Sequence, residues 1–127
     1  MFDKEKFSKA LDEDALPHYS MNCAKFVDKA LEAAGLDIHF HPGVARDYGP
    51  YLIGLGFHEV SDMGYSPEVG DIVVIQPSNH PEAAKISPDG HVAGYDGHQW
   101  ISDFRQIDMW GGPYRSAHLS YQIYRHN

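Results

Sequence analysis

Three residues with the chemistry for covalent catalysis occur in order along this chain: the single cysteine, Cys23, then His91 and Asp103. A cysteine thiolate is a nucleophile, an imidazole can take up its proton, and a carboxylate can orient the imidazole. Such a set predicts acyl transfer through a thioester, a reaction that needs no cofactor.

Cys23 lies at the start of the clearest helical pattern in the sequence. In NCAKFVDKALEAAGL, Asn22 can cap the helix, Gly35 suits the turn after it, and apolar residues recur at 23, 26, 27, 30, 31 and 34. The N-terminus of a helix favours a thiolate and offers N–H groups to an oxyanion. The alternative is that Cys23 is simply the first apolar residue of a buried helix face.

His91 opens the apolar segment GHVAGY, after a loop that contains Pro77, Pro81 and Pro88. A strand that packs against the cysteine helix would give a general base a rigid support. Taken alone, His91 is one of nine histidines, so an ordinary structural role is the competing interpretation.

Asp103 belongs to WISDFRQ, the expected strand partner of the His91 segment across a turn at Asp96-Gly97. We expect its carboxylate to accept the imidazole N–H on the side away from the thiol. Because a shift of one residue reverses the faces of a strand, Ser102 and Gln106 stay as alternatives. Asp103 would then be a surface carboxylate.

The remaining pattern predicts helices first and strands afterwards. Helical segments are expected at Phe2–Leu16 and within residues 42–55, where Gly49-Pro50 interrupts the pattern. Five strands are expected, at Phe57–Val60, Ile72–Gln76, His91–Tyr95, Gln99–Phe104 and Tyr121–Arg125. This order predicts one α+β domain over residues 1–127, with N-terminal helices packed on an antiparallel sheet.

Composition excludes several classes of function. A formal net charge of -8 without a Lys/Arg cluster opposes nucleic-acid binding. No apolar run is long enough to insert into a membrane, and the N-terminus lacks the apolar core of a signal peptide. One cysteine rules out an internal disulfide and a cysteine-rich zinc site, and His39 with His41 lacks further ligands, so no metal is expected.

The order of these motifs resembles a known group of enzymes. NCAKFVDKALEAAGL, then VGDIVVIQP, then GHVAGYDGHQWISDF, is similar to the papain-like NlpC/P60 and CHAP cysteine peptidases and amidases. The closing WGGPYRSAHLSYQIYR resembles small amidase-like proteins of phages and of interbacterial (type VI secretion) toxins. The resemblance covers roughly residues 18 to 127, and its specificity comes from the ordered combination.

The resemblance implies a papain-like fold and a peptidoglycan amide as substrate, either a stem-peptide bond or the muramoyl-alanine bond. It assigns nucleophilic attack to Cys23, proton transfer to His91 and orientation of the imidazole to Asp103. Asn22 stands where many CHAP domains have an oxyanion-binding glutamine, and Tyr19 where a tyrosine lines the NlpC/P60 cleft. A toxin of this kind would have a cognate inhibitor protein.

We expect a protein made in the cytoplasm that reaches peptidoglycan in the periplasm or cell wall without Sec export, as an antibacterial effector or a lysis enzyme. Two alternatives stay open. The same fold could act as a protease or acyltransferase on a substrate outside the wall, or the chain could be a noncatalytic binding module with an ordinary thiol.

Overall fold

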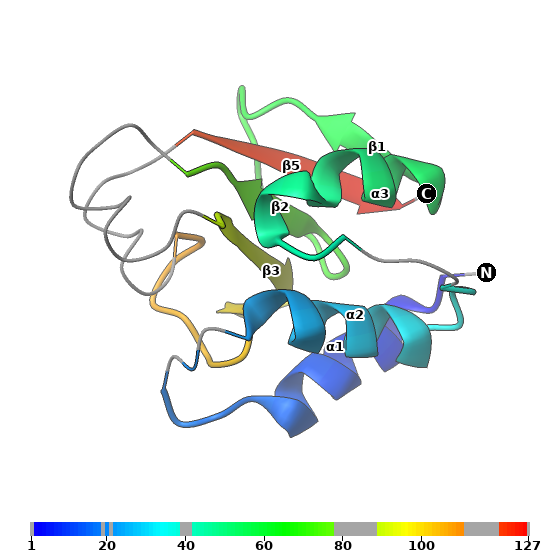
Figure 1. Ribbon diagram of the computed structural model, residues 1–127, viewed down its shortest axis with the longest axis vertical. Coiled ribbons are helices and arrows are strands. Elements are labelled where there is room, and N and C mark those ends of the chain that lie inside the picture. Colours follow the sequence, from blue (N-terminus) through cyan, green and yellow to red (C-terminus); the bar gives the residue numbers. More distant parts are fainter. Residues whose placement is uncertain are drawn as a thin grey trace.

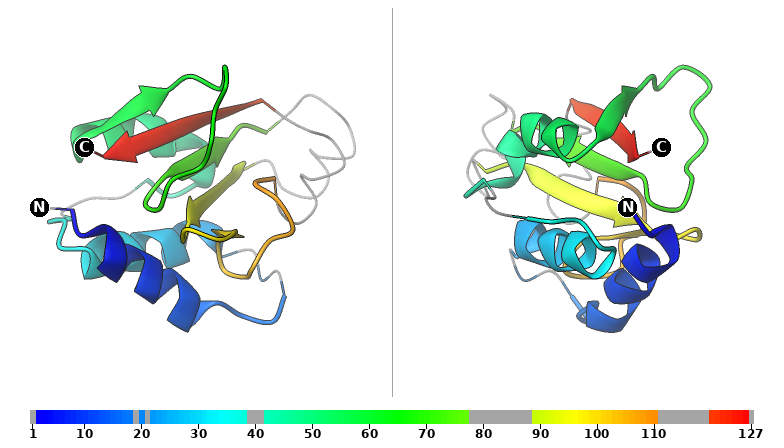
Figure 2. Two further views of the ribbon diagram at one scale, coloured as in Figure 1. Left: turned by 180° about the vertical axis from the view of Figure 1, so that it is seen from behind. Right: turned by 90° about the vertical axis from the view of Figure 1, so that its right-hand side faces the viewer.

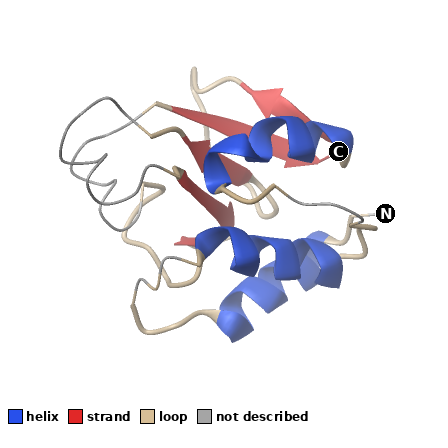
Figure 3. Cartoon of the chain, in the orientation of Figure 1, coloured by secondary structure: helices blue, strands red, loops and turns tan. Residues whose placement is uncertain are grey.

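The computed structural model describes residues 2–18, 20, 22–38, 42–77, 89–110 and 120–126. Figure 3 shows the helices, drawn in blue, beside a sheet drawn in red, with loops in tan between them. In the described ranges no helix is long and apolar enough to cross a bilayer.

Helix α1 spans Lys4–Asp14 and begins after Asp3. The Asp3 carboxylate accepts hydrogen bonds of 3.1 Å from two backbone N–H groups of the first turn, which have no acceptor inside the helix. Phe7 and Leu11 lie one turn apart and are buried. The helix predicted for Phe2–Leu16 is confirmed, although it begins later and ends earlier than predicted.

Helix α2 spans Cys23–Ala33 and lies beside α1 (Figure 1). Gly35 follows its end with a φ of 95°, a left-handed conformation that glycine adopts at no steric cost, as the sequence predicted. The face that packs into the core holds the residues with the predicted spacing, namely Cys23, Val27, Ala30 and Leu31.

The helical turns expected within residues 42–55 are also present. A 3-10 turn, η1, spans Ala45–Asp47 and leads into α3, which spans Tyr48–Gly54. Pro50 lies in the first turn of α3, where a missing N–H leaves no intrahelical acceptor unused.

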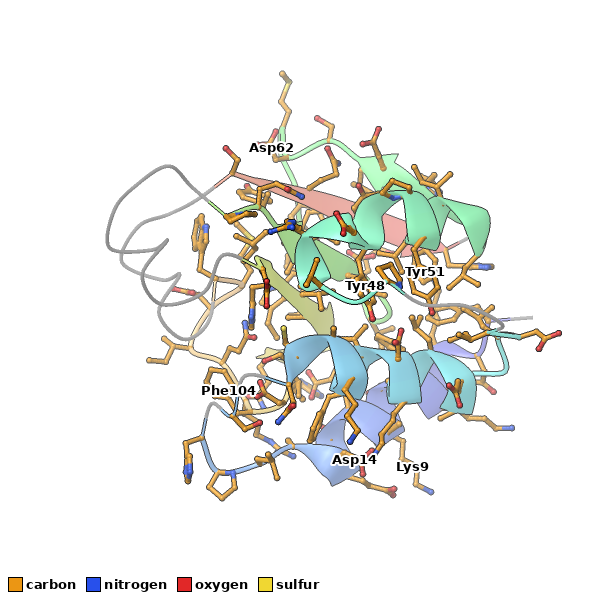
Figure 4. All side chains as sticks on the ribbon, viewed as in Figure 1. Lys9, Asp14, Tyr48, Tyr51, Asp62 and Phe104 are labelled. Carbon is orange, nitrogen blue, oxygen red and sulfur yellow. The ribbon has the colours of Figure 1, made fainter. Side chains whose placement is uncertain are left out.

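Two tyrosines of α3 hold α2 through one buried carboxylate. Asp28 of α2 is 8% exposed and accepts hydrogen bonds from the hydroxyl groups of Tyr48, at 2.8 Å, and Tyr51, at 3.1 Å. Figure 4 shows both tyrosines directed from α3 toward α2. Hydrogen bonds to a buried charged group are stronger than neutral ones, so this contact fixes the position of the helix that begins at Cys23.

The sheet has five antiparallel strands in the order β1-β5-β2-β3-β4. Their bounds are Phe57–Val60 for β1, Ile72–Ile75 for β2, His91–Tyr95 for β3, Trp100–Ile101 for β4 and Tyr121–His126 for β5. The predicted α+β class, with helices and an antiparallel sheet, is confirmed. Figure 2 shows the N-terminal segment close to the end of β5, where the Phe2 and His126 rings stack at 5.1 Å.

Both faces of the central strands are buried. In β2, Ile72 and Val74 pack with the helices, whereas Val73 and Ile75 pack on the opposite face with loop residues such as Trp110. A strand that is covered on both faces is a continuous apolar run rather than an alternating one. This explains why β2 reads IVVI in the sequence.

Helix α1 approaches β3 closely at Gly94. A Cβ atom at this position would lie 2.6 Å from Cζ of Phe7 and 2.8 Å from Cδ1 of Leu11. Only glycine therefore allows α1 and β3 to pack at this distance.

The strand predicted for Gln99–Phe104 is wrong beyond Ile101. The chain bends sharply after β4, with the Ser102 N–H bonded to the Phe104 carbonyl at 3.1 Å. The Gln106 N–H then donates to the carbonyl of Trp100 at 2.9 Å. Because the chain folds back in this way, Gln106 and not Asp103 lies beside His91 at the start of β3.

Candidate active site

Cys23 is the first residue of α2, as predicted, and its side chain is 8% exposed. Helix α2 packs on β3, and the backbone N–H groups of Val92, Ala24 and Cys23 itself lie close enough to the sulfur to favour a thiolate. Val92 directly follows His91, so the thiol lies against the start of the histidine strand.

Burial, however, reverses the expected effect of the helix start on the thiol. It raises the pKa of Cys23 to about 11, and the negative charge of Asp103 acts in the same direction. The three N–H groups lower the pKa only in part, because most of the thiolate's hydration is lost. Cys23 is therefore a protonated thiol at neutral pH.

The segment before α2 is held by side chains, although not by the predicted cap. The side chain of Asn22 makes no capping hydrogen bond to α2. Its Nδ2 group instead donates to the carbonyl and hydroxyl oxygens of Ser20, both at 3.1 Å. Asn22 is the residue at the N-cap position, as predicted, but its side chain does not form the capping hydrogen bond.

His91 is the first residue of β3, and its side chain is fully buried. Its Nε2 atom lies 2.7 Å from Oε1 of Gln106. The Nε2 group of Gln106 donates to the carbonyls of Asp108, at 2.9 Å, and Met109, at 3.2 Å. Since these carbonyls require the amide NH₂, Oε1 is the atom that faces the imidazole.

This hydrogen-bond network assigns the histidine tautomer. Oε1 of Gln106 can only accept, so Nε2 of His91 carries the proton and donates it. The buried Nδ1 atom then holds the lone pair of the neutral ring. A base needs this lone pair to take a proton from a thiol.

Burial also lowers the pKa of His91, because an imidazolium loses its hydration in the core. The hydrogen bond to Gln106 and the negative charge of Asp103 oppose this shift without reversing it. Both pKa shifts favour a neutral imidazole and a neutral thiol over an ion pair in the resting site.

Asp103 is fully buried, and its carboxylate serves the chain before α2. Oδ2 accepts from the N–H and hydroxyl of Ser20, at 2.7 and 2.6 Å, and from the N–H of Asn22 at 3.1 Å. Oδ1 accepts from the Ser102 hydroxyl at 3.0 Å. Burial alone would raise the pKa of Asp103, but these four hydrogen bonds hold it below the usual value.

The predicted hydrogen bond from His91 to Asp103 is therefore replaced by one from His91 to Gln106, which the sequence offered as an alternative. The bend after Ile101 causes the exchange, because it turns Asp103 toward Ser20. Asp103 still influences the imidazole through its charge, which raises the pKa of His91.

Other predicted residues lie elsewhere or outside the described part of the chain. Ser102 contacts Asp103, whereas Tyr19 and the pair His39 and His41 fall outside the described residues. Within the described residues, no group of three or more His, Cys, Asp or Glu side chains could hold a metal ion.

The sequence reasoning overlooked Ser20, whose backbone and side chain both bind Asp103. It also gave no role to the tyrosines that hold Asp28. A polar residue next to the helix start was the available signal for Ser20, but its partner lies 83 residues away.

Comparison with known proteins finds one clear relationship. A chain in the crystal structure of the type VI native effector-immunity complex Tae3-Tai3 from Ralstonia pickettii is 37% identical, with a TM-score of 0.85. The match covers 99% of this chain and 100% of that chain. The chain belongs to the Tae3 family.

The selenomethionine form of the Tae3-Tai3 complex from Ralstonia pickettii agrees, with 38% identity, a TM-score of 0.79 and coverage of 94% of this chain and 98% of that chain. No family model matches the sequence, and no curated protein matches it significantly. Membership of the Tae3 family therefore comes from the solved structures, and the likeness to the NlpC/P60 and CHAP enzymes stays a prediction.

Proposed function

We propose that this Tae3-family chain is a papain-like cysteine hydrolase that cleaves an amide bond in peptidoglycan, as an antibacterial type VI effector. The observation that carries the chemistry is the packing of the Cys23 helix start against the strand that begins with His91. The effector role is supported by the likeness to a complex described as a type VI effector bound to its immunity protein.

In the proposed reaction, His91 Nδ1 takes the proton of Cys23 as the sulfur attacks the amide carbonyl carbon. The neutral resting pair favours this concerted transfer, since a free thiolate is disfavoured by burial. The backbone N–H groups around Cys23 would then stabilise the oxyanion that forms beside the sulfur.

Collapse of this intermediate breaks the C–N bond, and the imidazolium gives its proton to the leaving amine. Water then attacks the thioester while His91 takes a proton from it, and the thiol leaves protonated. In this proposal Gln106 holds the ring in one orientation throughout, because its Oε1 accepts from Nε2 of His91 in both protonation states.

The remaining predicted residues take supporting roles in this proposal. Asp103 fixes the approach to α2 and stabilises the imidazolium by its charge. Asn22 can bind an oxyanion only if its Nδ2 group leaves Ser20, so we favour the backbone donors. Tyr19 keeps its proposed place in the cleft on the resemblance alone.

The partners follow from the same likeness. We propose peptidoglycan as substrate and a cognate immunity protein as inhibitor, with delivery by a route other than Sec export to the periplasm or wall of the target cell. The inhibitor would protect the producing cell and its kin from the enzyme.

The test is digestion of purified peptidoglycan sacculi by the wild type, Cys23→Ala and His91→Ala, with mass spectrometry of the released fragments. His58→Ala is the matched control, because His58 is an exposed histidine of β1. We expect fragments from the wild type and the control only, and their masses name the bond.

Equal release by Cys23→Ala would contradict the mechanism. If folded wild type releases nothing while its thiol still needs His91 for alkylation, a substrate outside the wall is favoured. If alkylation is also independent of His91, the chain is better described as a binding module.

A further inference from the structure

A groove of about 490 Å³ runs along α2, beginning one residue after Cys23. One wall is the face of α2 from Ala24 to Glu32, and the other consists of Pro42, Gly43 and Tyr48. Tyr48 joins the groove to the start of the helix, since its hydroxyl lies 3.5 Å from the Ala24 carbonyl oxygen. The groove therefore starts at the first turn of the helix that carries the proposed nucleophile.

Two lysines, Lys25 and Lys29, line this groove, and both are exposed. They are four residues apart, which places them on one face of the helix, roughly 6 Å apart along its axis. Neither forms an ion pair with a carboxylate among the described residues, although Lys29 Nζ lies 5.8 Å from the ring centroid of Phe26. Their ammonium groups are thus available to an anionic ligand.

The groove also contains acids, and their positions limit what it can bind. The buried Asp28 is already held by Tyr48 and Tyr51, while Glu32 marks the end farthest from Cys23. With a net charge of -8, the chain as a whole repels an acidic ligand. The lining of the groove carries two lysines and two acids, so it lacks the negative formal charge of the whole chain and offers Lys25 and Lys29 to a carboxylate.

We propose that this groove is the acidic-peptide subsite of the enzyme, in which Lys25 and Lys29 bind a free carboxylate of the substrate near the scissile amide. The inference rests on the proposed function and adds to it the charge of the substrate. Measured from Cys23, Lys25 lies about 3 Å and Lys29 about 9 Å along the helix axis. An extended peptide advances roughly 3.4 Å per residue, so the carboxylate belongs within about three residues of the cleaved bond.

The test compares two synthetic stem peptides that differ in one group only. Within about three residues of the cleaved bond, one peptide carries a free carboxylate and the other carries the corresponding amide. The wild type should cleave the free acid about tenfold better in kcat/KM, a difference that declines with added salt because these charges are exposed. The double variant Lys25→Gln/Lys29→Gln should lose this preference, because its kcat/KM falls for the free acid and changes little for the amide. Equal cleavage of the two peptides by the wild type would overturn the proposal.

The double variant Lys6→Gln/Lys9→Gln is the matched control, since both are exposed lysines of α1 that do not line the groove, and Lys9 lies away from it (Figure 4). It removes the same charge and should keep the wild-type preference. If it lowers cleavage of the free acid as much as the double variant does, net charge and not the groove is responsible.

Binding separates this inference from the proposed catalysis. In Cys23→Ser, NMR titration with the same peptides should show tighter binding of the free acid, and Lys25→Gln/Lys29→Gln should abolish the difference. Failure of the wild type to cleave, with lysine-dependent binding retained, overturns the catalysis but supports the subsite. Cleavage together with binding that ignores the lysines overturns the subsite alone.

Discussion

At the scale of single residues, Gln106 decides the state of the proposed base. Its amide is fixed by the two carbonyls it binds, and its oxygen then fixes which nitrogen of His91 carries the proton. An amide in this position orients the ring without adding charge. The low pKa that burial gives to His91 is therefore retained.

Replacing Gln106 by Ala should lower kcat on the order of 100-fold, because the imidazole is no longer held toward the thiol. Gln106→Glu should instead retain part of the activity and move the acidic limb of the pH profile to higher pH. A carboxylate beside the ring raises the pKa of His91, so the neutral base appears only at higher pH. The profile of kcat/KM against pH is the measurement, and an unchanged limb in Gln106→Glu would contradict this role.

The thiol itself offers a second test at this scale. With the pKa of Cys23 raised to about 11 by burial, alkylation by iodoacetamide should accelerate continuously from pH 6 to pH 10. An ion pair would give a plateau that begins below about pH 6. Mass spectrometry of the modified protein follows the rate, and such a low plateau would show that the thiolate forms at rest.

At the scale of elements, Asp103 joins the bend after β4 to the segment before α2. Its carboxylate collects hydrogen bonds from Ser20 and Asn22, which are distant in sequence, and so places the nucleophile relative to the sheet. The parallel bridge between Leu16 and Phe104 lies next to this contact. The site thus depends on one buried acid whose hydrogen bonds go to Ser20, Asn22 and Ser102 and not to the thiol or the imidazole.

Asp103→Asn should destabilise the fold by about 2–4 kcal/mol, because one acceptor oxygen is replaced by a donor that faces other donors. The pKa of Asp103 is lowered in the folded state, so its contribution is present above the unfolded pKa of about 3.9 and is lost as the pH falls through the folded pKa. Denaturant unfolding from pH 2 to pH 7 should show a weaker acid dependence in the variant.

Asp62→Asn is the control for this measurement, since Asp62 is exposed in the loop after β1 (Figure 4). It should leave the free energy of unfolding within about 0.5 kcal/mol of the wild type. An Asp103→Asn protein with the acid dependence of the wild type would mean that another group controls acid unfolding.

At the scale of the whole molecule, a buried ion pair stabilises the sheet through contacts apart from the candidate site. Asp71 is fully buried and accepts hydrogen bonds from Arg125 at 2.8 and 2.9 Å and from the Tyr65 hydroxyl at 2.7 Å. It connects the start of β2 to β5. Asp71, which belongs to the VGDIVVIQP segment of the resemblance, is therefore a structural anchor.

Asp71→Asn should cost about 3–5 kcal/mol, because the guanidinium of Arg125 would lose its buried partner and keep only the exposed carboxylate of Glu68. Glu68→Gln is the matched control: Glu68 lies 3.1 Å from Arg125, but its side chain is 57% exposed. That variant should cost less than about 1 kcal/mol. Thermal unfolding gives both values, and peptidoglycan hydrolysis per folded molecule should be unchanged; an Asp71→Asn protein as stable as the wild type would refute the anchor.

The sequence alone determined most of the elements and indicated the proposed nucleophile and base. Apolar spacing located α2 and placed Cys23 at its start, and an apolar run located β3 with His91 at its first residue. These features depend on local periodicity, which a sequence displays directly.

Only the tertiary structure decided which residue orients His91 and what charge the site carries. A bend of a few residues after Ile101 exchanged Asp103 for Gln106, and no periodic pattern encodes such a bend. The pKa of Cys23 likewise depends on burial by distant segments, which outweighs the local helix start. Side-chain partners and dehydration arise from packing between distant residues, so they become visible only once the chain is folded.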